Sequence, residues 1–166
     1  MTDTLTPVER AQRMRSVRQF DTDIEMRVRS LIHRSGYRFS LGRRDLPGSP
    51  DIVLSKHKVV CFVHGCFWHG HDCRAGRLPA TNHEWWAAKI DANRKRDEAA
   101  AAECSETGWR VLTVWQCALK GKCRMSCEEV RRALTSAIQG GACRVHIKGK
   151  EGPNPSQGSR DLPCND

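Results

Sequence analysis

Long apolar runs are missing from this sequence of 166 residues, of which 39% are hydrophobic and 28% are charged. No stretch approaches the roughly 18 consecutive apolar residues that a membrane-spanning helix needs. Residues 1–20 contain Asp3 and Glu9 and lack the continuous apolar core of a secretory signal peptide. We therefore expect a cytoplasmic protein without a membrane partner, and the length fits one compact domain.

Lysine is absent between residues 10 and 44, and acidic residues are few there. This segment carries ten arginines against three acids, and it accounts for most of the formal net charge of +9. A planar guanidinium can bind phosphate through two parallel hydrogen bonds, which an ammonium group cannot do. Scattered charge usually marks a solvated helix face, but the single sign and the absence of lysine favour a nucleic-acid partner over an acidic membrane.

The even number of cysteines that is typical of a disulfide scaffold is also missing, because the chain contains nine. Without an export signal, disulfide bonds are not expected. We interpret the cysteines as metal ligands and as small buried side chains.

Helix starts are marked by three capping patterns, in each of which Glu follows three residues after Ser or Thr. The patterns begin at Thr6, Thr22 and Ser126. Gly36 is placed to end the second of these helices. The alanine-rich segment 83–104, which follows Asn82 as its cap, is predicted to form a further, long helix.

Strands are predicted for four segments that are rich in β-branched and aromatic residues and bounded by Gly, Pro and Asp. They cover residues 37–41, 52–54, 59–63 and 109–115. Trp109 and Trp115 have the same parity in the last strand, and we expect both in the core. The order of helices and strands predicts an α/β fold, with a central mixed β-sheet flanked by helices.

Glycine and proline become frequent from residue 140 onward. This composition favours an unstructured end over a packed element, so we expect residues 140–166 to form a disordered tail. Residues 1–139 would then form a single domain, and its first helix, at about residues 6–19, would clamp DNA with its arginines.

Soft metal ligands lie close together after the third predicted strand. Cys66, His71 and Cys73 fall within eight positions, and a structural Zn²⁺ takes four such ligands in a tetrahedron. Cys117 is a candidate for the fourth, because a ligand at the end of the strand 109–115 would be held rigidly. Alternatively, Cys117 is a core cysteine and the histidines lie on the surface, but the close spacing makes this interpretation the weaker one.

A carboxylate and two histidines remain after the zinc ligands are assigned. Asp51 opens the second predicted strand, and His64 and His69 follow the next one. Phosphodiester hydrolysis requires a carboxylate that holds a divalent cation and a base that activates water near neutral pH. Without the neighbouring cluster, Asp51 would be interpreted as structural, because Asp is common at strand starts and turns.

Together, these motifs resemble those of the very-short-patch repair (Vsr-type) DNA mismatch endonucleases, a bacterial branch of the PD-(D/E)xK nuclease superfamily. The resemblance covers roughly residues 7–138, in order. The segments that carry it include Met14-Arg15-Ser16, Asp45-Leu46-Pro47-Gly48, Pro50-Asp51-Ile52-Val53, His64-Gly65-Cys66-Phe67-Trp68-His69, Pro79-Ala80-Thr81, Arg96-Asp97 and Gly108-Trp109-Arg110-Val111-Leu112.

The resemblance implies a restriction-endonuclease-like core and an enzyme that nicks DNA 5′ to the thymine of a T·G mispair, as left by deamination of 5-methylcytosine. Asp51 and the backbone carbonyl of Val63 would bind Mg²⁺. His69 would be the general base, and His64 would assist at the scissile phosphate. The four zinc ligands named above are implied as well, in a structural role.

The resemblance also assigns residues to DNA binding. Two aromatic residues between the zinc ligands, together with Trp86, would form a wedge between base pairs, although Trp86 could instead be ordinary core beside an exposed Trp85. Lys89 and Asn93, one helical turn apart, would face the mispaired bases. The full set is Met14, Arg15, Phe67, Trp68, Trp86, Lys89 and Asn93.

The implied partners are double-stranded DNA with a T·G mismatch, a functionally linked DNA cytosine methyltransferase and a repair polymerase, for a monomer near the bacterial nucleoid. Val63 and Gln116 depart from the threonine and glutamate that are common at these positions in the family. Two other functions stay open: a different PD-(D/E)xK nuclease, or a zinc-stapled DNA-binding module without catalysis. The carboxylate and histidine set favours an enzyme, because a binding module does not need it.

Overall fold

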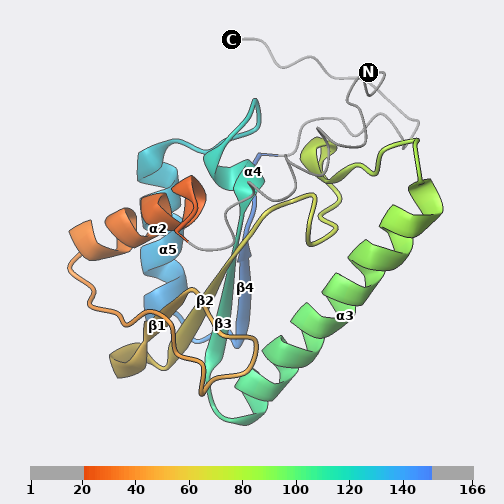
Figure 1. The fold of residues 1–166 in the computed structure, drawn as a ribbon. Helices are drawn as coiled ribbons and strands as arrows, with labels where there is room; N and C mark the ends of the chain where they lie inside the picture. The colour runs from red at the N-terminus through yellow and green to blue at the C-terminus, as the bar shows by residue number, and fades with distance from the viewer. Residues whose placement is uncertain (1–20, 151–166) are drawn as a thin grey trace.

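The computed structural model describes residues 21–150, which form three layers (Figure 1). A four-stranded sheet lies in the middle, with α2 and α5 on one face and α3 on the other. The sheet order is β1-β2-β3-β4; β1 pairs antiparallel with β2, whereas β2, β3 and β4 run parallel. The strands are β1 Ile52–Leu54, β2 Val59–His64, β3 Arg110–Trp115 and β4 Arg144–Ile147. The predicted α/β fold with a mixed central sheet is therefore confirmed.

Local capping determines where the helices begin. Thr22 accepts a hydrogen bond from the backbone N–H of Glu25, and Ser126 forms a complete capping box with Glu129. Asn82 precedes α3 as predicted, but it has a left-handed backbone with φ 54° and its side chain makes no capping hydrogen bond. The helices are α2 Asp23–Arg34, α3 His83–Glu106, α4 Gln116–Leu119 and α5 Cys127–Gln139. None of the helices within residues 21–150 has the length and apolar character of a membrane span.

The apolar core is divided by the sheet. The larger cluster lies beneath α2 and α5 and includes Val28, Leu112 and Leu134. The smaller cluster lies beneath α3 and includes Val53, Val60 and Cys104. Residues 59–63 are buried throughout, as expected for a strand covered on both faces.

The predicted tail is wrong for residues 144–147, which form β4 in parallel register with β3. Ile147 is buried in the main core, and the Gly140-Gly141 pair connects α5 to this strand. The glycines therefore mark a turn between two packed elements rather than the start of a tail. Residues 151–166, and the helix predicted from Thr6, lie outside the described residues.

Two further expectations need correction. The strand predicted at 37–41 is reduced to an isolated bridge between Ser40 and Val53, because Leu41 is exposed and Gly42 turns the chain with φ 64°. Trp109 and Trp115 are both only half-buried, since they lie at the two ends of the β3 segment rather than in its middle.

Candidate active site and metal centre

A cleft of about 660 Å³ lies between α3 and the face of the sheet that α3 covers. Residues of β2 and β3 form its floor, and residues of α3 form one wall. Asp51, His64, His69 and Asp97 all line it. The three residues predicted to be catalytic therefore share one cavity, together with an acid to which the sequence assigned no role.

Asp51 is anchored at the edge of the sheet just before β1. Its Oδ2 accepts a hydrogen bond from the backbone N–H of Val63, with 2.7 Å between the atoms. Burial raises the pKa of Asp51 to about 6, although the Val63 N–H opposes this shift. Because the N–H and C=O of a strand residue point toward the same neighbouring strand, the Val63 carbonyl points to the same side as Asp51. This pair of oxygen ligands suits Mg²⁺.

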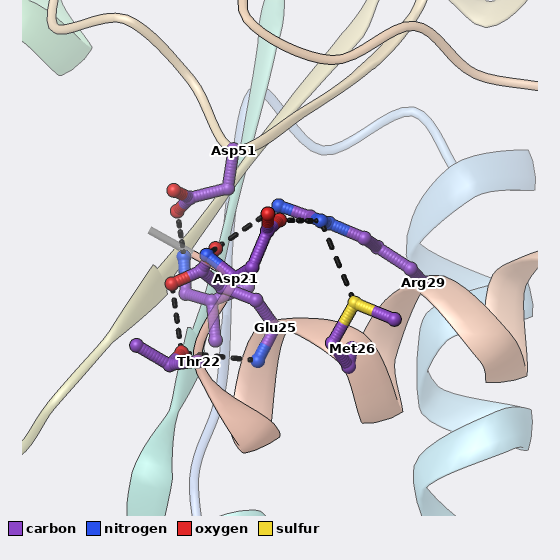
Figure 2. Close-up of polar contacts among 7 residues, drawn as sticks. Asp21, Thr22, Glu25, Met26, Arg29 and Asp51 are labelled. Atoms are coloured by element: carbon purple, nitrogen blue, oxygen red, sulfur yellow. Dashed lines mark hydrogen bonds and ion pairs between the residues drawn. The ribbon is translucent and has the colours of Figure 1, made fainter. Parts of the chain in front are cut away.

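Glu25 lies beside Asp51 and was missed as a site residue, because helix capping already explained it. Figure 2 shows Glu25 and Arg29 projecting from α2 next to Asp51. Glu25 is 5% exposed, and its Oε2 lies 3.0 Å from a guanidinium nitrogen of Arg29. Its negative charge contributes to the raised pKa of Asp51, so a cation at this point would relieve repulsion between two carboxylates.

His69 has the geometry of a general base. Its Nδ1 lies 2.5 Å from Oδ2 of Asp97, and a carboxylate at Nδ1 favours the tautomer that leaves Nε2 free to accept a proton. The rings of His64 and His69 are stacked, with 3.8 Å between centroids and 5° between planes. Burial lowers the pKa of His64 to about 3, so this ring is neutral near pH 7. Asp97 belongs to the Arg96-Asp97 motif, which was the only signal for it in the sequence.

The four predicted zinc ligands come together. One ligand atom from each of Cys66, His71, Cys73 and Cys117 lies within 4.8 Å of all the others. The N–H of Cys117 donates to Sγ of Cys66 and the N–H of Gly149 donates to Sγ of Cys117, both over 3.3 Å. The hydrogen bond from Cys66 is the largest of the effects that lower the pKa of the Cys117 thiol. Soft, thiolate-forming donors of this kind fit Zn²⁺.

Trp115 connects the two centres. Its ring centroid lies 5.3 Å from that of His64 and 4.4 Å from that of His71. Its indole N–H donates to Nδ1 of His146 on β4 over 3.3 Å. β4, which the sequence analysis assigned to a tail, therefore supports a residue between His64 and the cysteine cluster.

The three aromatic residues that are predicted to form a wedge contact one another. Phe67 and Trp86 lie 5.0 Å apart between ring centroids, and Trp68 lies 5.1 Å from Phe67. All three are half-buried, whereas the neighbouring Trp85 is 58% exposed. The expectation that only one of the two adjacent tryptophans turns inward is therefore confirmed.

Lys89 and Asn93 differ in exposure. Lys89 is exposed, but Asn93 is only 8% exposed. The Asn93 amide donates to the backbone carbonyl of Trp68 over 2.8 Å and accepts from Arg96 over 2.9 Å. The two side chains therefore do not form one open surface in this conformation. Met14 and Arg15 lie outside the described residues.

Comparison with known proteins places this site in context. Residues 2–75 match the family model described as DNA mismatch endonuclease Vsr. The chain is 54% identical over 119 residues to the type II nicking enzyme V.XorIIP of Xanthomonas oryzae, covering 72% of this chain and 88% of that relative. It is 39% identical over 147 residues to the DNA mismatch endonuclease Vsr of Escherichia coli, covering 89% and 94%. It is 38% identical over 140 residues to the nicking enzyme V.NmeAIP of Neisseria meningitidis, covering 83% and 100%.

Proposed function

The chain belongs to the family of Vsr-type DNA mismatch endonucleases, and from this premise we propose that it nicks DNA 5′ to the thymine of a T·G mispair. The cut would use Mg²⁺ and would start very-short-patch repair. The observation that carries the proposal is the cleft in which Asp51 lies near a histidine held by Asp97. A carboxylate for a cation and an oriented base are the two groups that phosphodiester hydrolysis requires.

Each catalytic residue has a distinct role in this proposal. Asp51 and the Val63 carbonyl hold Mg²⁺, which polarises the phosphate and stabilises negative charge when it is bound. Nε2 of His69 takes a proton from the attacking water, and Asp97 stabilises the imidazolium that results. His64, kept neutral by burial, stacks against His69 without adding a second positive charge and assists at the scissile phosphate.

The cysteine cluster has a structural role in this proposal. One Zn²⁺ held by Cys66, His71, Cys73 and Cys117 would fix the loop that carries Phe67, Trp68 and His69. The base would then keep its position relative to Asp51 when DNA binds. All four ligand positions are filled by the protein, as in structural rather than catalytic zinc sites.

Mismatch recognition would use the aromatic cluster formed by Phe67, Trp68 and Trp86. Inserting such side chains between base pairs costs on the order of a few kcal/mol of stacking, and this cost is lowest beside a mispair. Lys89 is exposed and free to reach the mispaired bases. Asn93 would reach them only after releasing its hydrogen bonds to Trp68 or Arg96. Met14 and Arg15 are proposed to contact DNA from the N-terminal segment.

The proposal extends to biological partners. The bases that flank the mispair would belong to the recognition sequence of a linked DNA cytosine methyltransferase. A repair polymerase would act on the nick. We propose that the protein acts as a monomer, since the wedge, the base and the cation ligands all come from one chain.

Asp51→Ala provides the test. The variant should bind a T·G duplex as the wild type does but should not nick it, while Asp91→Ala, an exposed carboxylate outside the cleft, should nick normally. Binding without cleavage by the wild type would instead indicate a DNA-binding module. Cleavage of branched or methylated duplexes in preference to T·G would indicate a different nuclease of the superfamily.

A further inference from the structure

The acidic side chains that line the cleft have basic partners, with one exception. Glu25 pairs with Arg29, Asp97 with His69 and Glu98 with Arg144. Asp51 has no cation within ion-pair distance among residues 21–150, which is consistent with its proposed role as a metal ligand.

Most of the arginines that line the cleft, by contrast, form no ion pair with a carboxylate of the described residues. Arg144 is neutralised by Glu98, whereas no carboxylate within the described part of the chain forms an ion pair with Arg94 or Arg96. Both side chains are exposed toward the cleft. Two uncompensated positive charges therefore remain in a cavity that must accept a phosphodiester.

Arg96 differs from Arg94 because its guanidinium is held in place. It donates to Oδ1 of Asn93 over 2.9 Å. An amide oxygen positions a guanidinium without cancelling its charge. A carboxylate would position the guanidinium and also cancel its charge. The long side chain therefore loses its conformational entropy before substrate binds. Charged groups that are ordered in advance give the strongest electrostatic stabilisation.

Asn93 is itself fixed to the loop that carries the base. It is 8% exposed, and its amide N–H group donates to the backbone carbonyl of Trp68, the residue before His69, over 2.8 Å. Arg96 is therefore positioned relative to the peptide that precedes His69. Asp97, the next residue of α3, binds the His69 ring. Two adjacent residues of α3 are therefore tied to His69: Asp97 binds its ring, and Arg96 is held next to the peptide that precedes it.

We infer that Arg96 binds a non-bridging oxygen of the scissile phosphate, and that Asn93 is the positioning residue that holds it there. The inference rests on the proposed function, because it assigns the phosphate of the nicked strand to this cleft. Arg96 then supplies a fixed positive charge opposite the cation site at Asp51.

A metal-free binding measurement tests this contact without relying on cleavage. Dissociation constants are measured in EDTA for a T·G duplex with a normal scissile phosphate and for one with an uncharged methylphosphonate there. The wild type should bind the methylphosphonate duplex about tenfold to a hundredfold more weakly, as for loss of one charge-assisted hydrogen bond. Arg96→Met should bind both duplexes equally, because the group that senses the charge is gone.

Controls separate a phosphate contact from a general loss of charge. Arg132→Met, which removes an exposed arginine of α5 that pairs with Glu128, should keep the full difference between the two duplexes. Arg96→Lys should keep part of it. With Mg²⁺ present, Arg96→Met should reduce the single-turnover nicking rate at saturating enzyme, and Asn93→Ala should reduce it less.

The outcomes distinguish this inference from the proposed function. If wild-type protein does not nick T·G duplexes, the proposed function fails, but the metal-free comparison still decides the role of Arg96. If Arg96→Met discriminates between the two duplexes as strongly as the wild type does, the inference is overturned, whatever the nicking activity.

Discussion

The imidazole rings of His64 and His69 are stacked with 3.8 Å between centroids, yet within residues 21–150 only His69 has a carboxylate, from Asp97, on its ring nitrogen. The two histidines are therefore not equivalent. Burial keeps His64 neutral, whereas Asp97 holds the ring of His69 through its Nδ1.

This asymmetry predicts unequal effects of the two alanine substitutions. His69→Ala should lower the single-turnover nicking rate by about 10²–10⁴-fold, the usual contribution of a positioned general base. His64→Ala should have a smaller effect on rate, because it removes a neutral group. A rapid-quench assay on a T·G duplex measures both, and a larger loss for His64→Ala would reverse the assignment.

Asp97→Asn should also reduce nicking, although the substitution hardly changes the shape of the side chain. The asparagine amide can donate to Nδ1 and so favour the wrong imidazole tautomer, and it cannot stabilise an imidazolium. We expect a rate loss of about tenfold or more, with affinity for the T·G duplex unchanged. A parallel loss of affinity would indicate that Asp97 instead supports the fold of the cleft.

The raised pKa of Asp51 predicts a dependence of stability on pH. The pKa of this carboxyl is about 6 in the folded protein, against an ordinary value of 3.8. Below pH 3.8 both states hold the proton, so there is no penalty. As the pH rises through 3.8 to 6, the unfolded state releases the proton first, and the folded state loses stability until its own carboxyl ionises.

In EDTA, Asp51→Asn should therefore be more stable than the wild type at pH 7–8, by about 1–3 kcal/mol. The advantage should shrink toward pH 4, and Mg²⁺ should reduce it by stabilising the wild type. Denaturant unfolding across this pH range measures the difference. A variant that is equally stable, or less stable, at pH 8 would contradict the environment described for Asp51.

Purified protein should contain one Zn²⁺ per chain when no chelator is used. Cys73→Ala should remove the metal and lower the melting temperature, because three protein ligands cannot close a structural site. Cys143→Ser, an exposed cysteine outside the cluster, should retain the metal. Elemental analysis that finds no zinc in the wild type would refute the assigned ligands.

The aromatic cluster predicts a difference between two adjacent tryptophans. Trp86→Ala should weaken discrimination between T·G and matched duplexes, because Trp86 packs against both Phe67 and Trp68. Trp85→Ala should change it less, since of that trio the exposed Trp85 contacts Trp86 alone, with 4.7 Å between ring centroids. Competition binding with the two duplexes gives the ratio, and equal effects would argue against a defined wedge.

Features set by local sequence were predictable. Thr22 and Ser126 marked helix starts because capping depends on residues three positions apart, and the close spacing of Cys66, His71 and Cys73 predicted that they cluster. Cys117 was found because the end of a strand is a rigid position for a ligand.

Features that depend on contacts between residues far apart in the sequence were not predictable. The pairing of Asp97 with His69 joins α3 to the cysteine loop, and Glu25 lies near Asp51 only because α2 packs against β2. Residues 144–147 have the composition of a weak strand, and it is pairing with β3 and burial of Ile147 that stabilise them. None of these relationships is visible over a short stretch of chain.

The most direct test of the central claim is to map the cut on a T·G duplex labelled separately on each strand, with and without Mg²⁺. The account predicts a single nick 5′ to the mispaired thymine, only with Mg²⁺ present, and an intact strand opposite. Cleavage of both strands, cleavage at the guanine strand, or an identical nick in EDTA would contradict it.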